Sequence, residues 1–255
     1  MLEYPFIRFD NQEWLEKLQN GDFYMRNSLY YQRLEADDQA RHDPFDGGIP
    51  FPDVNGVMKS LSGQETSNER LMLLDRFIKC FYHCTAEDFT YIGGNFWKLK
   101  LSERTMKMAA AFKCDSAMLI LSPVDFIEQI KNVCIKKQKQ MWYGDVEYCN
   151  GAAYVDAVRE LLENPSQAYK VPFYKDERFS DQKEFRICIQ HPFVSQDDRR
   201  GWMELPASLA EKPYPFDIGA IKDTCIISLD NLFQHGILLD LQNEHYYVCE
   251  ESDNA

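Results

Sequence analysis

The sequence predicts an α+β protein whose β-sheet is mixed but mainly antiparallel and is flanked by helices. Short alternating or apolar segments typical of strands are interspersed with amphipathic segments typical of helices, without regular alternation of the two. Regular strand–helix–strand alternation would favour a parallel α/β sheet instead. The 255 residues suit a single domain over residues 1–250, followed by an acidic tail at 250–255 that we expect to fray.

The amino-terminal half supplies a strand, a helix, a long loop and a second strand. We expect a strand at 5–9, a helix within 10–21, an extended segment at 22–31, a long loop or lid at 35–70 and a strand at 77–82. Asp10 or Asn11 can cap the helix, and Trp14, Leu15 and Leu18 form its apolar stripe.

The carboxy-terminal half continues the mixed pattern. We expect a strand within 93–102, a helix at 103–114, a buried strand at 116–122, a helix from Pro123 with an alternative change to strand near 133–136, a strand at 141–149, a helix at 151–164, a strand at 183–190, and final strands or a short helix over 216–249. No internal repeat interrupts this order.

Charge and cysteine usage exclude several classes of protein. The net charge of −13 argues against a surface that follows nucleic acid over its whole extent, although a local basic cleft remains compatible with it. No apolar run is long enough for a membrane span, so we expect no membrane partner. The first residues lack a signal peptide and the eight cysteines are scattered, which predicts reduced thiols and a cytoplasmic location. Cys80, His83 and Cys84 invite a zinc interpretation, but no second ligand pair accompanies them, and we expect no metal.

Two features carry candidate chemistry. Gln182, Glu184 and Arg186 alternate and would share one face of the late strand, whereas Phe185, Ile187 and Ile189 share the other. A half-buried strand explains this pattern without any function, and a Gln-x-Glu pair projecting into a cleft explains it with one. The second feature is Arg8 on the first strand, where a guanidinium can pair with a carboxylate or bind a phosphate through two parallel hydrogen bonds.

A family resemblance joins these features. The segments FIRF, NGDFYMRNSLYYQR, HDPFDG, FIKCFYHCTAEDF and FYKDERFSDQKEFRICI follow one another within residues 5–190 and resemble a bacterial domain family of unknown function. Their order is also similar to the ADP-ribosyltransferase fold of the Arg–Ser–Glu type. That pattern has an Arg on the first core strand, a Ser-x-Ser on a middle strand and a Gln/Glu-x-Glu where a late strand begins.

The match to the Arg–Ser–Glu pattern is good at its ends and poor in its middle. Arg8 matches the first element, and Gln182 with Glu184 matches the last. The Ser-x-Ser of residues 60–62 lies in the predicted loop, and the middle strand carries Cys80, His83 and Thr85 instead.

The resemblance implies a split sheet and an NAD-dependent transferase without a metal. Glu184 would hold a ribose hydroxyl and stabilise the oxocarbenium-like state, Gln182 would orient the acceptor and Arg8 would bind the pyrophosphate. The candidates for contact with the NAD, chiefly by stacking on the nicotinamide, are Tyr24, Phe81, Tyr82 and His83. The implied protein is a toxin or phage-defence enzyme that transfers ADP-ribose to a protein or nucleic acid, with an antitoxin or inhibitor as a further partner.

Other interpretations stay open. The lysine-rich strip at 131–143, which ends in Trp142 and Tyr143, could contact a nucleic-acid strand, although such strips are more often solvated faces. The chain could be an NAD glycohydrolase, or a non-catalytic binding or regulatory protein on a transferase-like scaffold. A metal-dependent nuclease would need the aspartates of the 35–70 loop, namely Asp43, Asp46 and Asp53, whose setting is more typical of turns.

One structural feature separates the enzyme from the binding protein. The enzyme requires Arg8 and Glu184 to converge on one open cleft. A buried pair between Glu184 and either Arg186 or Arg178 would favour the binding protein.

Overall fold

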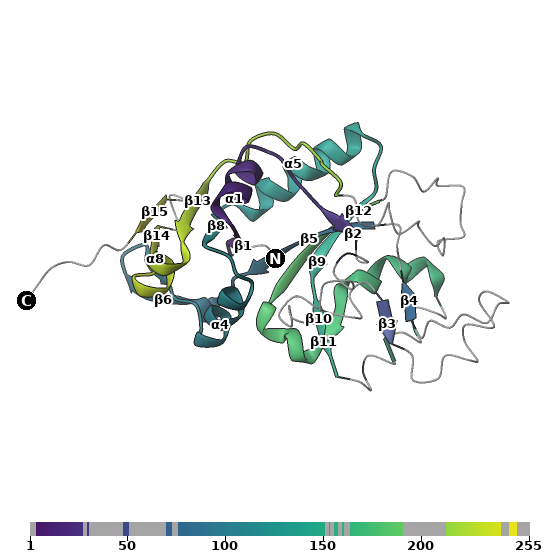
Figure 1. The fold of residues 1–255 in the computed structure, drawn as a ribbon, viewed down its shortest axis with the longest axis horizontal. Helices are drawn as coiled ribbons and strands as arrows, with labels where there is room; N and C mark the ends of the chain where they lie inside the picture. The colour runs from purple at the N-terminus through teal and green to yellow at the C-terminus, as the bar shows by residue number, and fades with distance from the viewer. Residues whose placement is uncertain are drawn as a thin grey trace, which may run out of the picture.

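The fold is α+β, with mainly antiparallel sheets and several helices, as the sequence predicts (Figure 1). The computed structural model describes residues 4–27, 30, 48–50, 70–72, 76–150, 153, 156–157, 160, 164–190, 213–240 and 245–248. In chain order the elements are β1 (Phe6–Asp10), α1 (Gln12–Gln19), β2 (Arg26–Asn27), β3 (Gly48–Pro50), β4 (Arg70–Met72), β5 (Arg76–His83), η1 (Ala86–Asp88), β6 (Phe89–Gly93), β7 (Phe96–Leu99), α4 (Glu103–Ala111), β8 (Ser116–Ile120), α5 (Pro123–Lys136), β9 (Met141–Asp145), β10 (Glu147–Cys149), η2 (Pro165–Phe173), β11 (Tyr174–Asp176), η3 (Glu177–Gln182), β12 (Glu184–Gln190), β13 (Thr224–Ser228), α8 (Leu229–Gln234), β14 (Ile237–Asp240) and β15 (His245–Val248).

The central sheet has the strand order β13-β8-β1-β5-β12-β9, and β2 adds to β5. Every neighbouring pair in it is antiparallel. The first strand, β1, lies in the middle of this sheet. This position suits its sequence, because Phe6 packs into the core on one face and Ile7 and Phe9 pack into the core on the other.

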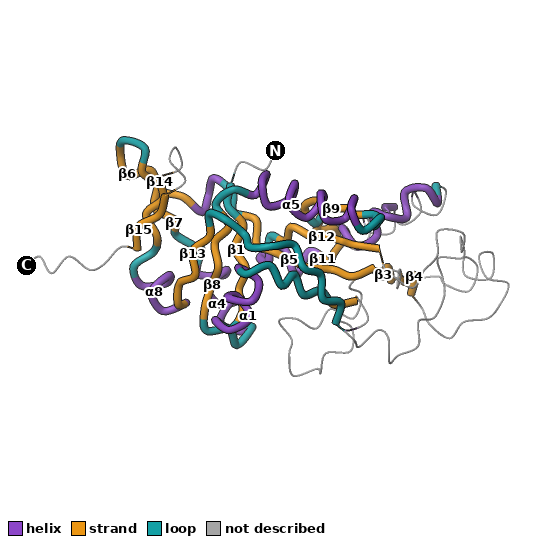
Figure 2. Tube along the Cα trace, turned by 90° about the horizontal axis from the view of Figure 1, so that it is seen from above, coloured by secondary structure: helices purple, strands orange, loops and turns teal. Residues whose placement is uncertain are grey.

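One face of the central sheet packs against α5 and α1. Phe6, Phe81 and Phe185 come from three adjacent strands and form one aromatic group there, in which the Phe6 ring centroid lies 5.9 Å from that of Phe81 and 4.5 Å from that of Phe185. Phe126, Ile127 and Ile130 of α5 and Leu15 and Leu18 of α1 complete this core. Figure 2 shows α5 lying along one side of the sheet.

The opposite face is covered by two separate groups of elements. Over β13, β8 and β1 lie α4, α8 and the smaller antiparallel sheet β15-β14-β7-β6, which bury Ile7, Leu119 and Ile227 with Leu99 and Leu239. Over β12 lie η2 and β11, where the carbonyl of Pro172 accepts from Nη1 of Arg186 at 2.7 Å. The candidate site is lined by residues from both groups, among them Met108 of α4 and Lys175 of β11.

The sheet is split where β1 and β5 part. Their ladder holds two pairs, Phe6 with His83 and Ile7 with Tyr82. Beyond Ile7 the next residues of β1 and β5 do not pair, and β5 pairs instead with β2, through Ile78 and Phe77. The missing rungs leave a gap in an otherwise continuous sheet.

Several predictions on individual elements need correction. The alternative change to strand near 133–136 is wrong, because α5 continues to Lys136 on the buried stripe that includes Ile130 and Cys134. Trp14 is not part of the apolar stripe of α1, since it is 44% exposed while Leu15 and Leu18 are buried. The late strand begins at Glu184 rather than at residue 183.

Some predictions fall outside the described residues. They are most of the 35–70 loop, including Ser-x-Ser 60–62 and the three loop aspartates, most of the 151–164 helix and the 250–255 tail. Of the 35–70 segment, β3 is described, together with Arg70, which opens β4. Among the helices of the described residues, none is both long and apolar enough to cross a membrane.

Candidate functional site

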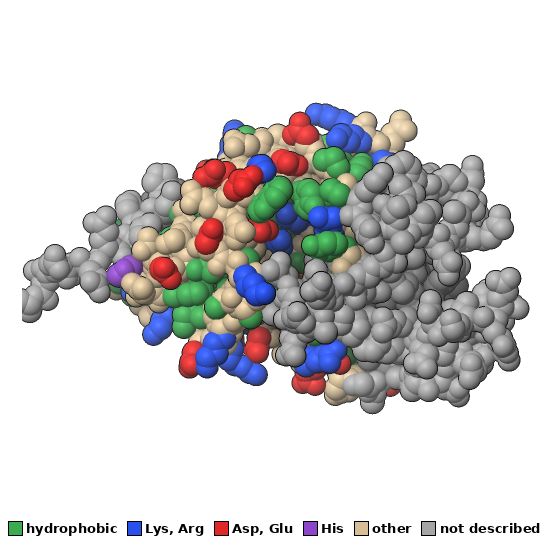
Figure 3. Space-filling view, in the orientation of Figure 1, with side chains coloured by type: hydrophobic (Ala, Val, Ile, Leu, Met, Phe, Trp, Pro, Cys, Tyr) green, Lys and Arg blue, Asp and Glu red, His purple; other side chains and the backbone are tan. Residues whose placement is uncertain are grey.

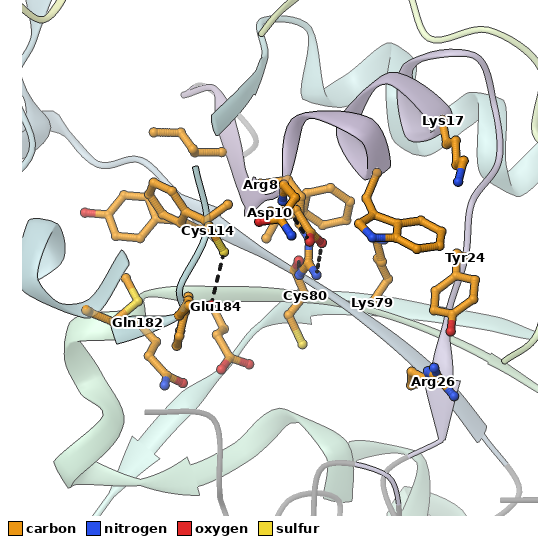
Figure 4. A pocket seen from close by; sticks show the side chains of 18 of the residues that line it. Arg8, Asp10, Lys17, Tyr24, Arg26, Lys79, Cys80, Cys114, Gln182 and Glu184 are labelled. Carbon is orange, nitrogen blue, oxygen red and sulfur yellow. Dashed lines mark hydrogen bonds and ion pairs between the residues drawn. The ribbon is translucent and has the colours of Figure 1, made fainter. Parts of the chain in front are cut away.

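The split in the sheet is a pocket of about 380 Å³. The residues that would have formed the missing rungs between β1 and β5 all line it, namely Arg8, Phe9, Asp10, Lys79, Cys80 and Phe81. Residues of both sheet faces contribute, because the two strands have separated there. Figure 4 shows Arg8, Asp10, Cys80 and Lys79 in the middle of the pocket, with Gln182 and Glu184 on one side and Tyr24 and Arg26 on the other.

Arg8 spans the gap. Its Nη1 donates to the backbone carbonyl of Cys80 at 3.0 Å, which takes the place of a backbone bond that the parted strands cannot make. Its Nη2 donates to Oδ2 of Asp10 at 2.9 Å. Burial opposes ionisation of Asp10, but the charges of Arg8 and Lys79 outweigh it and hold the pKa of this carboxyl below its ordinary value.

Lys79 is a pocket residue that the sequence interpretation missed. It lies on β5 between Phe77 and Phe81 and is 7% exposed. Burial, and next the charge of Arg8, lower the pKa of its amine to about 7, although Asp10 acts in the opposite direction. The sequence contained one indication of this residue, namely a lysine at a position of an otherwise apolar strand. It indicates a buried amine only once β5 is known to lie in the middle of the sheet.

Glu184 stands at one end of the pocket in a buried group that we call the ion triad, with Lys175 and Arg186. Lys175 Nζ lies 2.7 Å from Oε1 of Glu184, and Arg186 Nε lies 2.7 Å from Oε2. The exposed fractions of the three side chains are 11% for Glu184, 5% for Lys175 and 0% for Arg186. Burial alone would raise the pKa of Glu184, but Arg186 and Lys175 outweigh it, so the carboxyl is held well below its ordinary pKa.

Gln182 reaches the same lysine from a different element. It closes η3, and Lys183 follows with φ of 38°, in the left-handed region, before β12 begins. The prediction that Gln182, Glu184 and Arg186 share one strand face is therefore wrong for Gln182, which lies in η3 and not in β12. They meet because Lys175 Nζ also donates to Oε1 of Gln182, at 2.6 Å.

Aromatic and basic side chains alternate at the other end of the pocket. Trp14 and Tyr24 have ring centroids 5.9 Å apart, and Lys17 Nζ lies 4.0 Å from the Trp14 ring centre. The guanidinium of Arg26 lies over the rings of Tyr24 and Tyr30, at 5.0 and 4.2 Å. Such a surface offers flat faces and positive charge together, which suits a ring carried by an anionic ligand.

The pocket reverses the charge balance of the chain. Acidic residues outnumber Lys and Arg by 41 to 28 overall. Among the described residues that line the pocket the basic side chains prevail, with Arg8, Lys17, Arg26, Lys79 and Lys175 against Asp10, Asp22 and Glu184. Basic and hydrophobic side chains meet at a hollow in the middle of the face drawn in Figure 3. The site is therefore electrostatically suited to an anion.

Most of the predicted site residues come together here. Arg8, Tyr24, Phe81, Tyr82, Gln182 and Glu184 all line the pocket. Tyr82 offers its ring rather than its hydroxyl, because the hydroxyl donates to Oδ1 of the buried Asp88 at 2.8 Å. Burial and then the charge of Asp88 raise the pKa of this phenol, against the opposing effect of its hydrogen bond to Thr105.

His83 is not one of the residues that line this pocket. Its Nδ1 lies 2.6 Å from Oδ1 of Asp145, and its ring packs edge-on against Phe6 and Phe185. The proposed contact of His83 with NAD is therefore not supported by its position. Arg178 is also placed elsewhere: its partner is Asp176 at 3.8 Å, so Arg186 and not Arg178 engages Glu184.

The alternative sites find little support among the described residues. No group of three or more His, Cys, Asp or Glu that could hold a metal occurs in this part of the chain. In the lysine-rich strip, Lys131 pairs with Glu128 at 2.8 Å and Lys137 lies over the Phe216 ring at 4.5 Å. No protein-family model, curated protein or solved structure matches the chain.

Proposed function

We propose that the chain binds NAD in the pocket between β1 and β5 and transfers its ADP-ribose to a macromolecular acceptor. The observation that carries this proposal is the convergence of Arg8 and Glu184, 176 positions apart in a chain of 255 residues, on one positively charged pocket. NAD joins two aromatic bases, two riboses and a pyrophosphate, and the pocket offers a counterpart for each kind of group.

The order of side chains along the pocket suits an extended dinucleotide. Arg8 lies in the middle, where a guanidinium can fork onto the pyrophosphate. Trp14 and Tyr24 at one end provide faces on which a base can stack. Glu184 and Gln182 at the other end lie where a ribose and its leaving group would be placed.

Glu184 remains chemically suited to a ribose although it is already paired. Each carboxylate oxygen can accept more than one hydrogen bond, so acceptance from Lys175 and Arg186 still allows acceptance from a ribose hydroxyl. The two cations keep the carboxyl ionised, which is the form that stabilises an oxocarbenium-like state. Gln182, held by Lys175, would orient the acceptor beside it.

The ion triad favours a second candidate, a binding protein that recognises NAD or a related nucleotide without cleaving it. Two cations within 2.7 Å neutralise the charge of Glu184 and weaken the field that it exerts on a developing positive centre. The same pocket would then serve to sense or sequester the nucleotide. A setting in toxin action or phage defence, with an antitoxin or inhibitor as partner, belongs to either candidate through the family resemblance alone.

The test separates binding from chemistry. NAD binding is measured by calorimetry, and nicotinamide release is measured with and without a mixture of cellular protein, RNA and DNA. Glu184→Asp retains the charge, Glu184→Gln removes it, and Glu103→Gln removes a carboxylate on the exposed surface of α4 as a control. Release that needs both the macromolecules and Glu184 supports the transferase, and release without macromolecules identifies a glycohydrolase. Binding without release from folded protein supports the second candidate, and absence of binding rejects both.

A further inference from the structure

The amine of Lys79 has a setting that the proposed function leaves unexplained. Lys79 is 7% exposed and lines the pocket, yet it makes no hydrogen bond or ion pair with another described residue. Its Nζ lies 6.0 Å from the centre of the Phe23 ring. A buried amine directed into a pocket without an acceptor is costly unless a ligand supplies one.

The charged groups around Lys79 in the described part of the chain do not form an ion pair with its amine. The charged and titratable groups that act on it are Arg8 and Asp10 from β1, Cys80 beside it on β5 and Asp22 between α1 and β2. Of the two carboxylates in this set, Asp10 already accepts from Arg8 through its Oδ2 at 2.9 Å. Arg26 on β2 directs its guanidinium toward Tyr24 and Tyr30. Two cations, Arg8 and Lys79, thus line one pocket, and the carboxylates that act on Lys79 are those of Asp10 and Asp22.

We infer that Lys79 and Arg8 form a subsite for a pyrophosphate diester, and that Lys79 takes up a proton from solution when this group binds. The inference rests on the proposed function for the identity of the pocket. It adds Lys79 as a binding residue and the protonation of its amine as a step that accompanies ligand binding. Without ligand the amine is close to half charged at neutral pH, because burial and Arg8 lower its pKa to about 7. A bound diester brings negative charge beside Nζ and favours the ammonium form. The buffer acid gives up the proton, which forms a third N–H bond on Nζ of Lys79, and no bond of the ligand is made or broken.

The linkage has a definite direction. An amine that must be protonated in the complex makes binding weaker as pH rises above the pKa of the free site. The dissociation constant is therefore expected to increase about fifteenfold from pH 7 to pH 8.5. A pyrophosphate diester does not titrate in this range, so the pH dependence reports the protein.

The experiment is calorimetric titration with ADP-ribose at pH 7 and pH 8 in two buffers with different ionisation enthalpies. The full chain is expected to take up about half a proton per ligand at pH 7 and about nine-tenths of a proton at pH 8. Lys79→Met should lose the uptake and bind at least tenfold more weakly at pH 7. Lys79→Arg should bind without uptake, because a guanidinium stays charged at both pH values.

Matched controls assign the proton to Lys79. Lys100→Met removes an exposed lysine outside the pocket and should retain both affinity and uptake. Adenosine, which lacks the phosphates, should bind without uptake. Each variant is first shown by circular dichroism and thermal melting to be folded.

The outcomes of the experiment bear separately on the two proposals. Uptake that is unchanged in folded Lys79→Met, or binding without uptake by the full chain, would overturn the inference. Binding of a short single-stranded oligonucleotide but not of ADP-ribose would overturn the assignment to a pyrophosphate. Uptake that depends on Lys79, combined with no nicotinamide release from NAD, would uphold the subsite while rejecting the transferase.

Discussion

Replacement of Glu184 by glutamine tests whether the ion triad is a structural unit. The substitution preserves the shape of the side chain but removes the charge that both Lys175 and Arg186 face at 2.7 Å. Glutamine retains one carbonyl oxygen, and its amide NH₂ would face a second donor. Both cations therefore lose their negatively charged partner in a buried environment, and one of them also loses a hydrogen-bond acceptor at residue 184.

The magnitude follows from burial. Removal of one partner from a buried ion pair costs about 3–5 kcal/mol, because the remaining charge is left uncompensated. Arg186 is fully buried and Lys175 nearly so, and we expect the free energy of unfolding of Glu184→Gln to fall by about this amount. The effect should depend on pH. The pKa of Glu184 lies below its ordinary value of 4.5, so its contribution is fully present above that pH and is lost as pH falls below it.

The assay is urea unfolding at pH 7 with Glu103→Gln as the control. Glu103 and Lys107 are also 2.7 Å apart but are about three-quarters exposed, so this control should lose less than about 1 kcal/mol. The double variant Lys175→Met with Glu184→Gln should lose less than the sum of the two single losses, because it no longer contains a buried Lys175 charge without the Glu184 carboxylate. A loss below about 1 kcal/mol for Glu184→Gln, equal to that of the control, would refute the reasoning about the ion triad.

Three further predictions concern other parts of the pocket. Lys79→Met should be more stable than the parent at pH 6, by at most about 5 kcal/mol, since one pKa unit corresponds to about 1.4 kcal/mol. That stability advantage should shrink as pH rises from about 7 toward 10.5, because the unfolded parent chain then binds a proton that the folded chain does not. Thermal melts of both proteins across this pH range measure the difference, and a difference that stays constant would contradict the prediction. Arg8→Lys should weaken ADP-ribose binding about 10- to 100-fold in a calorimetric titration, because one ammonium cannot fork onto a pyrophosphate; unchanged affinity in the folded variant would remove Arg8 from the subsite. Gly21→Ala should lower the free energy of unfolding in urea by about 2–4 kcal/mol, because Gly21 has φ of 103° and a Cβ would lie 2.5 Å from the backbone of Gly219. The control Gly94→Ala should cost about 1 kcal/mol, since Gly94 has φ of 62° and the nearest atom to its Cβ would lie at 3.8 Å. Equal losses in the two variants would contradict the close approach of Gly21 to Gly219.

The candidate site could be predicted in part from the sequence. Arg8 stood out because a charged residue interrupts an apolar strand, and Glu184 because it alternates with Gln182 and Arg186 in a strand that is otherwise apolar. Lys175 did not stand out, since it lies in a charged, irregular stretch, and only folding brings it to Glu184. His83 was assigned to the pocket from its neighbours in the sequence, and its position beside Asp145 was decided by the pairing of β5 with β12 and of β12 with β9.

The sequence by itself determined the local elements, because hydrophobic periodicity and capping are short-range properties that each segment carries alone. The strands at β1, β5 and β8 and the helices α1, α4 and α5 were all readable in this way. The tertiary structure alone decided that β1 and β5 part after two pairs, since strand register depends on what covers each face of the sheet. The pocket, the burial of Lys79 without an ion pair to a described residue, and the ion triad all depend on long-range geometry, which no single segment encodes.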